Sequence, residues 1–234
     1  MSLRGMDMVI FALCMPLVVL FVLGIIYGNK PAFEGAAYTF IDQSMGGIAA
    51  IAICAGGLMG LPLVVSDYRG KGILKRFKVT PVSPVMILAV QVTVYTLYAL
   101  ASLGTVMLTA MIFFKFELRG SGLEFAFGWL LVLVSMFSIG MLVGGIAKNS
   151  KQAGMIASVL YFPMLIFSGT TIPYEVMPKA MQRVVDVLPM TQGIKVLKAA
   201  ALGLPAGEIT IPVIILAVIA LACTAASIKL FRWE

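Results

Sequence analysis

Histidine is absent from this sequence, and charged residues make up only 12% of its 234 residues. Histidine is the commonest general base and the commonest metal ligand, so its absence removes the usual centre of acid–base or metal chemistry. Soluble domains carry about twice this share of charge. Because 61% of the residues are hydrophobic, a soluble fold of this size could not bury them all, and we predict an integral membrane protein.

The alternation of apolar and polar residues that a membrane β-barrel requires is also missing. The apolar runs of this sequence are continuous. Since only helices and closed barrels satisfy every backbone polar group in lipid, the predicted fold class is an all-α integral membrane protein.

The usual signs of catalysis are missing as well. There is no Walker A pattern for ATP, and no histidine or acidic residue deep in an apolar run to activate a serine. Cys14, Cys54 and Cys223 lie inside apolar runs without a CxxC motif, which indicates neither a metal site nor a disulfide framework. We expect them to be small buried hydrophobes. The chain is therefore predicted not to be an enzyme and to bind no cofactor directly.

Six apolar runs predict transmembrane helices within a single domain over residues 1–234. They are residues 8–27, 44–65, 85–114, 123–147, 152–167 and 209–231. The first run resembles a signal peptide, but it is as long as a span, which takes about 20 residues, and no cleavage site follows. We therefore expect it to be retained as a span.

Two features inside the predicted spans concern helix contacts. Gly56 and Gly60, and likewise Gly140 and Gly144, are four residues apart, a spacing that lets a second helix approach closely and that suggests a dimer. A polar cluster in residues 85–114 includes Gln91, Tyr95 and Tyr98. These side chains either form hydrogen bonds between helices or line a transport pathway, and the sequence leaves both alternatives open.

Charge is distributed unequally between the two sides that six spans define. One side carries ten basic and three acidic residues, a net charge of +7, whereas the other carries seven of each. Because basic residues concentrate on the cytoplasmic side of membrane proteins, we predict that both termini and residues 66–84 are cytoplasmic. Residues 168–208 then lie outside.

The cytoplasmic stretch 66–84 reads S-D-Y-R-G-K-G-I-L-K-R-F-K-V-T-P-V-S-P. A helix over residues 67–78 places its lysines on one face and its apolar residues on another, and the prolines that follow end it. Such a stretch is either a solvated loop whose charges only fix topology or a docking element for a cytoplasmic partner. The candidate docking residues are Tyr68, Arg69, Lys71, Ile73, Leu74, Lys75, Arg76, Phe77 and Lys78.

The outer stretch 168–208 contains four prolines and charges of both signs. From residue 175 to 188, apolar residues recur at helical spacing, which predicts an amphipathic helix lying on the membrane interface. Those apolar residues are Met177, Met181, Val184, Val185 and Leu188. Residues 193–202 are expected to form a second short helix.

Three motifs in this order resemble those of ABC-2 type permeases. The first is the G-I-L-K-R-F run leading into T-P-V-S-P (residues 72–84), the second is F-S-G-T-T-I-P (167–173), and the third is L-P-M-T-Q-G-I-K-V-L-K (188–198). Two departures stand out: Gly70 occupies a position that is often acidic in the family, and residues 1–7 are too short for the family's full amphipathic elbow helix.

The resemblance implies the permease subunit of an ATP-driven exporter in the plasma membrane of a prokaryote. Two permease copies, as a homodimer, would form the pathway, and two cytoplasmic ATPase subunits would bind ATP and Mg. Residues 67–78 would be the coupling helix that rests on the ATPase. The outer gate would be formed by Phe167, Ser168, Gly169, Thr170, Pro173, Met177 and Met181.

The substrate is not specified by the sequence. An uncharged interior rich in methionine and phenylalanine favours a hydrophobic or amphiphilic compound, such as a drug or lipid, so that multidrug efflux is one expectation. Nothing indicates a nucleic-acid partner. The alternative function is a gated channel or a membrane scaffold that needs no ATPase.

Overall fold

The computed structural model of the chain describes residues 3–28, 30–33, 35–73, 84–169, 174, 177–205, 207 and 209–230, with the backbone alone for residues 3–11 and 84. Within these ranges no strand forms, and one isolated bridge joins Pro31 to Thr39. The all-α prediction is confirmed. The helices are α1 (Leu3–Tyr27), α2 (Phe40–Cys54), η1 (Ala55–Gly60), α3 (Leu61–Gly70), α5 (Pro84–Phe114), α6 (Gly122–Ile146), α7 (Ser150–Phe167), α8 (Lys179–Val185), α9 (Pro189–Leu202) and α10 (Thr210–Leu230).

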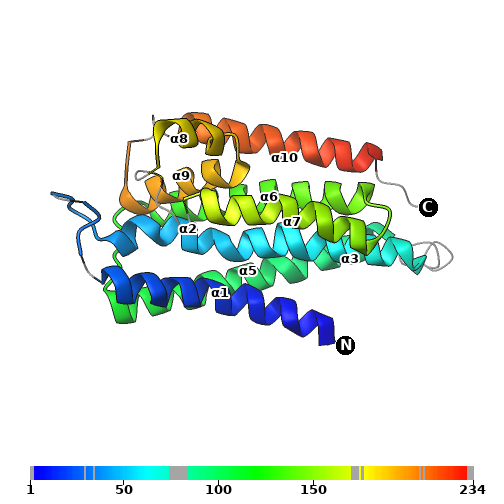
Figure 1. Cartoon of the computed structure of the whole chain (residues 1–234), viewed down its shortest axis with the longest axis horizontal. Helices are drawn as coiled ribbons and strands as arrows, with labels where there is room; N and C mark the ends of the chain where they lie inside the picture. The colour runs from blue at the N-terminus through cyan, green and yellow to red at the C-terminus, as the bar shows by residue number, and fades with distance from the viewer. Residues whose placement is uncertain are drawn as a thin grey trace.

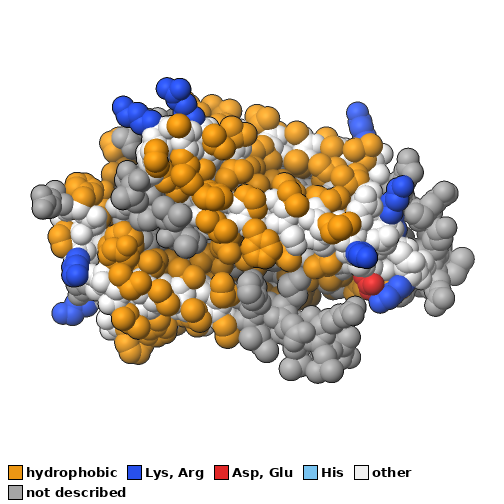
Figure 2. All heavy atoms as spheres, viewed as in Figure 1, with side chains coloured by type: hydrophobic (Ala, Val, Ile, Leu, Met, Phe, Trp, Pro, Cys, Tyr) orange, Lys and Arg blue, Asp and Glu red, His pale blue; other side chains and the backbone are white. Residues whose placement is uncertain are grey.

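The long helices lie side by side along the long axis of the molecule (Figure 1). Helices α8 and α9 and the start of α2 lie at one end, which we call the α9 end. The last turn of α3 lies at the other, the α3 end, where α10 also finishes (Figure 1). Hydrophobic side chains cover much of the surface between the two ends, and lysine and arginine side chains gather at the ends (Figure 2). This distribution suits a protein that crosses a bilayer.

Four described helices are long and apolar enough to span a membrane: Phe40–Gly70, Val85–Phe114, Gly122–Ile146 and Thr210–Leu230. In α1, the residues whose side chains the structure describes, Ala12–Tyr27, form a shorter apolar helix. Helix α7, whose first turn is polar, is not among the four. The number of six spans therefore stays a prediction.

The second predicted span differs from the observed helix at both ends. Helix α2 begins at Phe40, so residues 40–43, which lie before the predicted span of residues 44–65, are helical and buried. A capping box explains this start, because the Thr39 side chain accepts a hydrogen bond from the Asp42 N–H (3.1 Å) and the Asp42 carboxylate accepts one from the Thr39 N–H (2.9 Å). At the other end the helix continues beyond Val65 to Gly70.

Helices α2, η1 and α3 form one continuous helix at the centre of the bundle. Its 31 residues extend about 46 Å at the rise of an α-helix. Of its most apolar stretch of 18 residues, 83% is buried inside the molecule. The corresponding share is 22% for α5 and for α10. We call it the central helix, and it packs against α1, α5, α6, α7 and α9.

The π-helical segment η1 lies in the middle of the central helix, where Pro62 follows three glycines. Proline has no N–H to donate, and its ring clashes with the carbonyl four residues earlier, so a regular α-helix is disturbed here. The wider turn appears in the hydrogen bond from the Leu61 N–H to the Gly56 carbonyl, five residues back. Such π-segments are frequent at functional sites.

Glycines allow neighbouring backbones to touch the central helix. A Cβ atom on Gly140 of α6 would lie 1.8 Å from the Gly57 carbonyl oxygen, and one on Gly46 would lie 2.8 Å from the Lys198 backbone nitrogen of α9. Tyr95 of α5 fills the space over Gly56 and Gly60. Both GxxxG pairs are thus packing seams, as the spacing predicted, but they serve contacts within one chain rather than between two copies.

The predicted interfacial helix over residues 175–188 is wrong in length. Helix α8 has only seven residues, because Pro178 stands at its N-cap and Pro189 begins the next helix. Of its predicted apolar residues, Met177 and Val185 are buried, but the Val184 side chain is 70% exposed. Helix α9 covers the predicted second helix and starts four residues earlier, and it is buried between α2, α6, α7 and α10.

The cysteine prediction holds for one residue of three. Cys54 is buried beside η1, whereas Cys14 is exposed on α1 and Cys223 is half-buried on α10. Cys14 and Cys223 lie on helices at the outside of the bundle, where an apolar side chain can face lipid instead of a protein core.

The Gly140 contact yields a stability prediction with a matched control. Gly140→Ala should destabilise the protein by about 1–3 kcal/mol, because a backbone oxygen cannot move away from the new methyl group as a side chain can. Gly104→Ala meets no atom within 4 Å, and should be neutral or gain up to about 1 kcal/mol of helix propensity. Thermal unfolding of both purified variants in detergent measures the difference, and equal melting curves would contradict the backbone contact.

Candidate functional sites at the two ends of the bundle

The last turn of α3 is tied to three other helices by three consecutive residues. The Arg69 guanidinium donates a hydrogen bond to the Gly145 carbonyl in the last turn of α6. The carbonyls at a helix C-terminus lack partners within the helix and carry partial negative charge, so a cation is well placed there. Arg69 therefore fixes the end of α6 to α3.

Asp67 connects α3 to α7. The Ser150 hydroxyl in the first turn of α7 donates to the Asp67 Oδ1 atom at 3.4 Å. The Asp67 Oδ2 atom pairs with the Lys71 ammonium at 2.6 Å, but the Lys71 side chain is 62% exposed. An exposed pair contributes little to stability, so the contact with Ser150 is the structural link and the contact with Lys71 is peripheral.

Tyr68 connects α3 to α5, since its hydroxyl accepts a hydrogen bond from the Gln91 amide at 3.1 Å. Successive residues of a helix point about 100° apart, so Asp67, Tyr68 and Arg69 reach three different neighbours. We call these three residues with their partners Ser150, Gln91 and Gly145 the α3 hub.

The coupling helix predicted over residues 67–78 is not continuous. Residues 67–70 belong to α3, whose C-cap is Lys71, and Gly72 has a φ of +65°. This left-handed conformation suits glycine and ends the helix. Tyr68, Arg69, Lys71 and Ile73 are described, whereas Leu74, Lys75, Arg76, Phe77 and Lys78 lie outside the described residues.

The residues predicted as hydrogen-bonding or pathway-lining side chains all lie on the α5 surface near the central helix. Gln91 forms the bond between helices just described. Tyr95 is buried against η1, and its ring meets that of Tyr98 edge to face at 6.2 Å. The hydrogen-bonding alternative thus accounts for Gln91, and the lining of a pathway stays a prediction.

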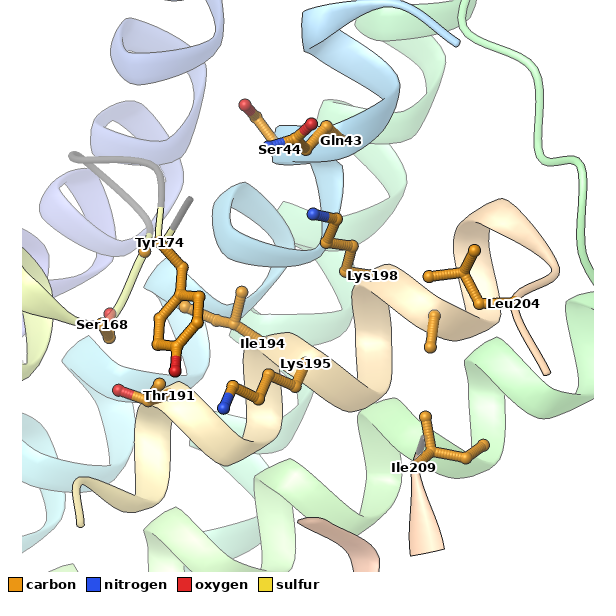
Figure 3. A pocket seen from close by; sticks show the side chains of 12 residues that line it. Gln43, Ser44, Ser168, Tyr174, Thr191, Ile194, Lys195, Lys198, Leu204 and Ile209 are labelled. Atoms are coloured by element: carbon orange, nitrogen blue, oxygen red, sulfur yellow. The ribbon is translucent and has the colours of Figure 1, made fainter. Parts of the chain in front are cut away.

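A cavity of about 310 Å³ lies at the α9 end (Figure 3). It is bounded by the start of the central helix, the end of α7, helix α9 and the segment before α10. Its lining residues are Gln43, Ser44, Ser168, Gly169, Tyr174, Thr191, Ile194, Lys195, Lys198, Ala199, Leu204 and Ile209. We call it the α9 pocket.

One face of α9 supplies the polar wall of this pocket, because Thr191, Lys195 and Lys198 follow one another at i, i+4 and i+7. The Lys195 ammonium pairs with the Asp186 Oδ1 atom at 2.7 Å and lies 4.4 Å from the centre of the Tyr174 ring. The Tyr174 hydroxyl donates to the other Asp186 oxygen at 2.9 Å. These contacts hold Lys195 and Tyr174 in fixed positions at the pocket.

Tyr174 stays neutral in this arrangement. Partial burial raises the pKa of its hydroxyl above the ordinary value, and the hydrogen bond to the Asp186 carboxylate raises it further, while the nearby Lys195 ammonium acts in the opposite direction. At physiological pH the hydroxyl is therefore a donor to Asp186.

The predicted outer-gate residues fall partly at this pocket. Ser168 and Gly169 line it, and Phe167 is the last residue of α7. Met177, which precedes α8, is buried, and Met181, in the first turn of α8, is half-buried. Thr170 and Pro173 lie outside the described residues. Whether these residues gate a pathway stays a prediction.

The pocket residues from α2 and α9 were not among the residues predicted from the sequence. The stretch L-P-M-T-Q-G-I-K-V-L-K does place Thr191, Lys195 and Lys198 on one helical face, so a helical projection could have found them. Gln43 and Asp186 could not be found in this way, because only the fold brings them to that face.

Long apolar helices that carry their charged residues at the ends define an integral membrane protein. The chain matches the model of the ABC-2 type transporter family over residues 2–202, so it belongs to the ABC-2 type transporter family. This family is one of membrane transport components. Members of this family normally work with an ABC ATPase.

Individual relatives match shorter parts. The inner membrane transport permease YhhJ of Escherichia coli (strain K12) is 26% identical over 170 residues, which is 72% of this chain and 43% of that protein. The protein of the same name from Shigella flexneri matches equally. Nodulation protein J of Neorhizobium galegae is 31% identical over 74 residues, 32% of this chain and 28% of that protein. The match thus covers less than half the length of each relative.

Proposed function

We propose that this chain is the transmembrane subunit of an ABC exporter that moves a hydrophobic or amphiphilic compound out of the cytoplasm. A separate pair of cytoplasmic subunits binds and hydrolyses ATP with Mg. Two copies of the chain form the pathway as a homodimer. The chain crosses the plasma membrane of a prokaryote six times, with the α3 end and both termini in the cytoplasm.

The α3 hub is the observation that carries this proposal. A force applied to the segment after Gly70 acts on the last turn of α3, and through Asp67, Tyr68 and Arg69 it acts on α7, α5 and α6 together. Packed elements linked in this way shift as rigid bodies rather than deform continuously. An ATPase docked on residues 71–78 can therefore move much of the bundle at once.

Family membership and the charge distribution support the proposal. Arg69, Lys71, Lys148 and Lys151 at the α3 end belong to the side that carries ten of the seventeen basic residues of the sequence, which agrees with a cytoplasmic side under the positive-inside bias. The relatives from Escherichia coli and Shigella flexneri are themselves named transport permeases.

The proposed sidedness can be measured with two single cysteines in a chain in which Cys14, Cys54 and Cys223 are replaced by alanine. Lys71→Cys and Lys179→Cys sit on exposed positions at opposite ends. In intact cells a membrane-impermeant maleimide should label Cys at position 179 and not at position 71, and both should react after the cells are opened. Labelling of position 71 in intact cells would refute the proposed orientation.

Coupling can be measured on the complex isolated from the source cells through a tag on this chain. An ABC ATPase subunit should copurify. In liposomes, Arg69→Ala should lower the ATP hydrolysis rate by about 10-fold or more, since a hydrogen bond from a charged group to the end of α6 is lost. Lys71→Ala removes an exposed pair with Asp67 and, in the docked complex, one exposed ionic contact, and should lower it by less than about 5-fold.

The outcomes of this experiment separate the proposed exporter from its alternative. A chain that purifies alone and lets ions cross vesicles without ATP would be a channel. If the ATPase copurifies but Lys71→Ala has a larger effect than Arg69→Ala, the hub does not carry the coupling.

A further inference from the structure

The α9 pocket has two sides that differ in chemistry. The Lys198 side chain extends toward Gln43 on α2 and away from Thr191 (Figure 3). Around Thr191 the contacts are different, since the Lys195 ammonium lies 4.4 Å from the centre of the Tyr174 ring. A Cβ atom on Gly169 would lie 3.8 Å from Tyr174 and 4.0 Å from Ile194, so these residues are neighbours. We call this part of the pocket the Thr191 side, and its lining residues are Gly169, Tyr174, Thr191, Ile194 and Lys195.

The Thr191 hydroxyl lacks a hydrogen-bond partner among the residues that the structure describes, although Thr191 is only 1% exposed. Buried hydroxyls nearly always have a partner, and an O–H donor that is left unpaired away from water is costly. Because Thr191 lines a cavity, a molecule in that cavity can supply the missing acceptor.

The two ammonium groups of the pocket are already engaged. Lys195 pairs with the Asp186 carboxylate at 2.7 Å, and Lys198 has an interaction of its own within the chain. No carboxylate occurs among the described lining residues. A charged group on the Thr191 side would therefore lose its water without gaining an ion-pair partner, whereas an uncharged group needs only one hydrogen bond.

The surface beside the Thr191 hydroxyl is apolar. Ile194 contributes an aliphatic side chain, and Tyr174 presents its ring, because its hydroxyl donates to Asp186 at 2.9 Å. The whole cavity has a volume of about 310 Å³, which is at the lower end of the range for ligand pockets. Such a lining matches a molecule that has one uncharged polar group next to hydrocarbon.

We propose that the Thr191 side of the α9 pocket binds an uncharged oxygen group, a hydroxyl or a carbonyl, at the head of an amphiphile. The Thr191 hydroxyl donates to that oxygen, and Ile194 and the Tyr174 ring pack against the carbons next to it. This assigns an uncharged head to the compound that the proposed exporter carries, and in that respect it rests on the proposed function. Binding itself needs no ATPase, so it can be tested apart from coupling.

The test follows occupancy of the pocket with a cysteine reporter in the purified full chain, held in phosphatidylcholine nanodiscs. Ile209→Cys, in the chain whose three native cysteines are replaced by alanine, places one thiol on the half-buried pocket wall. A molecule bound in the pocket should slow the modification of this thiol by a small thiol reagent. The probes are 1-decanol, decane, decyl phosphate and decyltrimethylammonium, compared at equal concentration in the bilayer, and glycerol, which carries hydroxyls without a chain.

The probes separate the hydroxyl from the chain and from charge. 1-Decanol should protect the thiol, and decane should need about 2-fold to 10-fold more for the same protection, the range for one uncharged hydrogen bond. Decyl phosphate and decyltrimethylammonium should each need at least about 10-fold more, because a charged head would be buried without a partner.

Three variants in the reporter chain assign the contact. Thr191→Val has nearly the shape of the parent and should weaken protection by 1-decanol by about 2-fold to 10-fold, while protection by decane stays unchanged. Thr191→Ser keeps the hydroxyl and should retain more of the affinity for 1-decanol than Thr191→Val. Ser102→Ala is the matched control, because it removes another buried hydroxyl without a partner among the described residues, on α5 and outside the pocket. It should behave like the parent.

Thermal unfolding without any probe tests the premise. Thr191→Val should unfold at the temperature of the parent or above it, since an unpaired buried hydroxyl is removed. A clear loss of thermal stability would mean that this hydroxyl is bonded within the protein, and would overturn the proposal.

The other outcomes are equally decisive. Equal protection of the parent by 1-decanol and decane would overturn the proposal, even if no variant could be purified, as would stronger protection by either charged probe. Protection by glycerol at the concentration that suffices for 1-decanol would overturn the assignment to an amphiphile. Failure of ATPase copurification, with protection by 1-decanol intact, would refute the exporter but leave the site.

Discussion

Contact between backbones at glycine holds this bundle around its central helix. Lipid tails are as apolar as the side chains they meet, so helices in a membrane associate through close packing rather than through the exclusion of water. Gly57 touches Gly140 of α6, and Gly46 touches the backbone of α9. At each contact a residue larger than glycine would not fit, because its Cβ atom would clash with the neighbouring backbone. These close contacts allow the central helix to be buried among so many neighbours.

The same helix carries both candidate sites. Its first turns supply Gln43 and Ser44 to the α9 pocket, and its last turn supplies the α3 hub. The π-segment η1 separates the two parts. Under the proposed function, this arrangement allows a movement imposed at the hub to reach the pocket along one continuous element, without a chain of loops between them.

Much of the fold could be predicted because its physical cause is local. Helix α5 matches the predicted run almost to the residue, since the run is uninterrupted and the helix begins at Pro84. The start of α2 was missed because Asp42 looked like a loop residue, although the T-x-x-D spacing of a capping box was present. The end of α3 was predicted less well. A helix was expected over residues 67–78, but α3 ends at Gly70, and the sequence did not indicate that Asp67 and Arg69 bind distant helices.

The candidate sites were predictable to a smaller extent. The sequence indicated the region of the hub from its charges, but not that consecutive residues bind three helices. It indicated an amphipathic segment before α10, but not that α9 would be buried and turn Lys198 toward α2 (Figure 3). Burial of a short helix depends on the space its neighbours leave, and here that space comes from glycines on α2 and α6.

The link between hub and pocket can be measured most directly at Ser44, the pocket residue on the central helix. In the assembled complex, with Ser44→Cys as the sole cysteine of this chain, the rate of modification by a small thiol reagent is compared without nucleotide and with a non-hydrolysable ATP analogue. The account predicts that nucleotide changes this rate and that the change disappears in Arg69→Ala. A rate that nucleotide leaves unaltered, or a change that persists in Arg69→Ala, would contradict it.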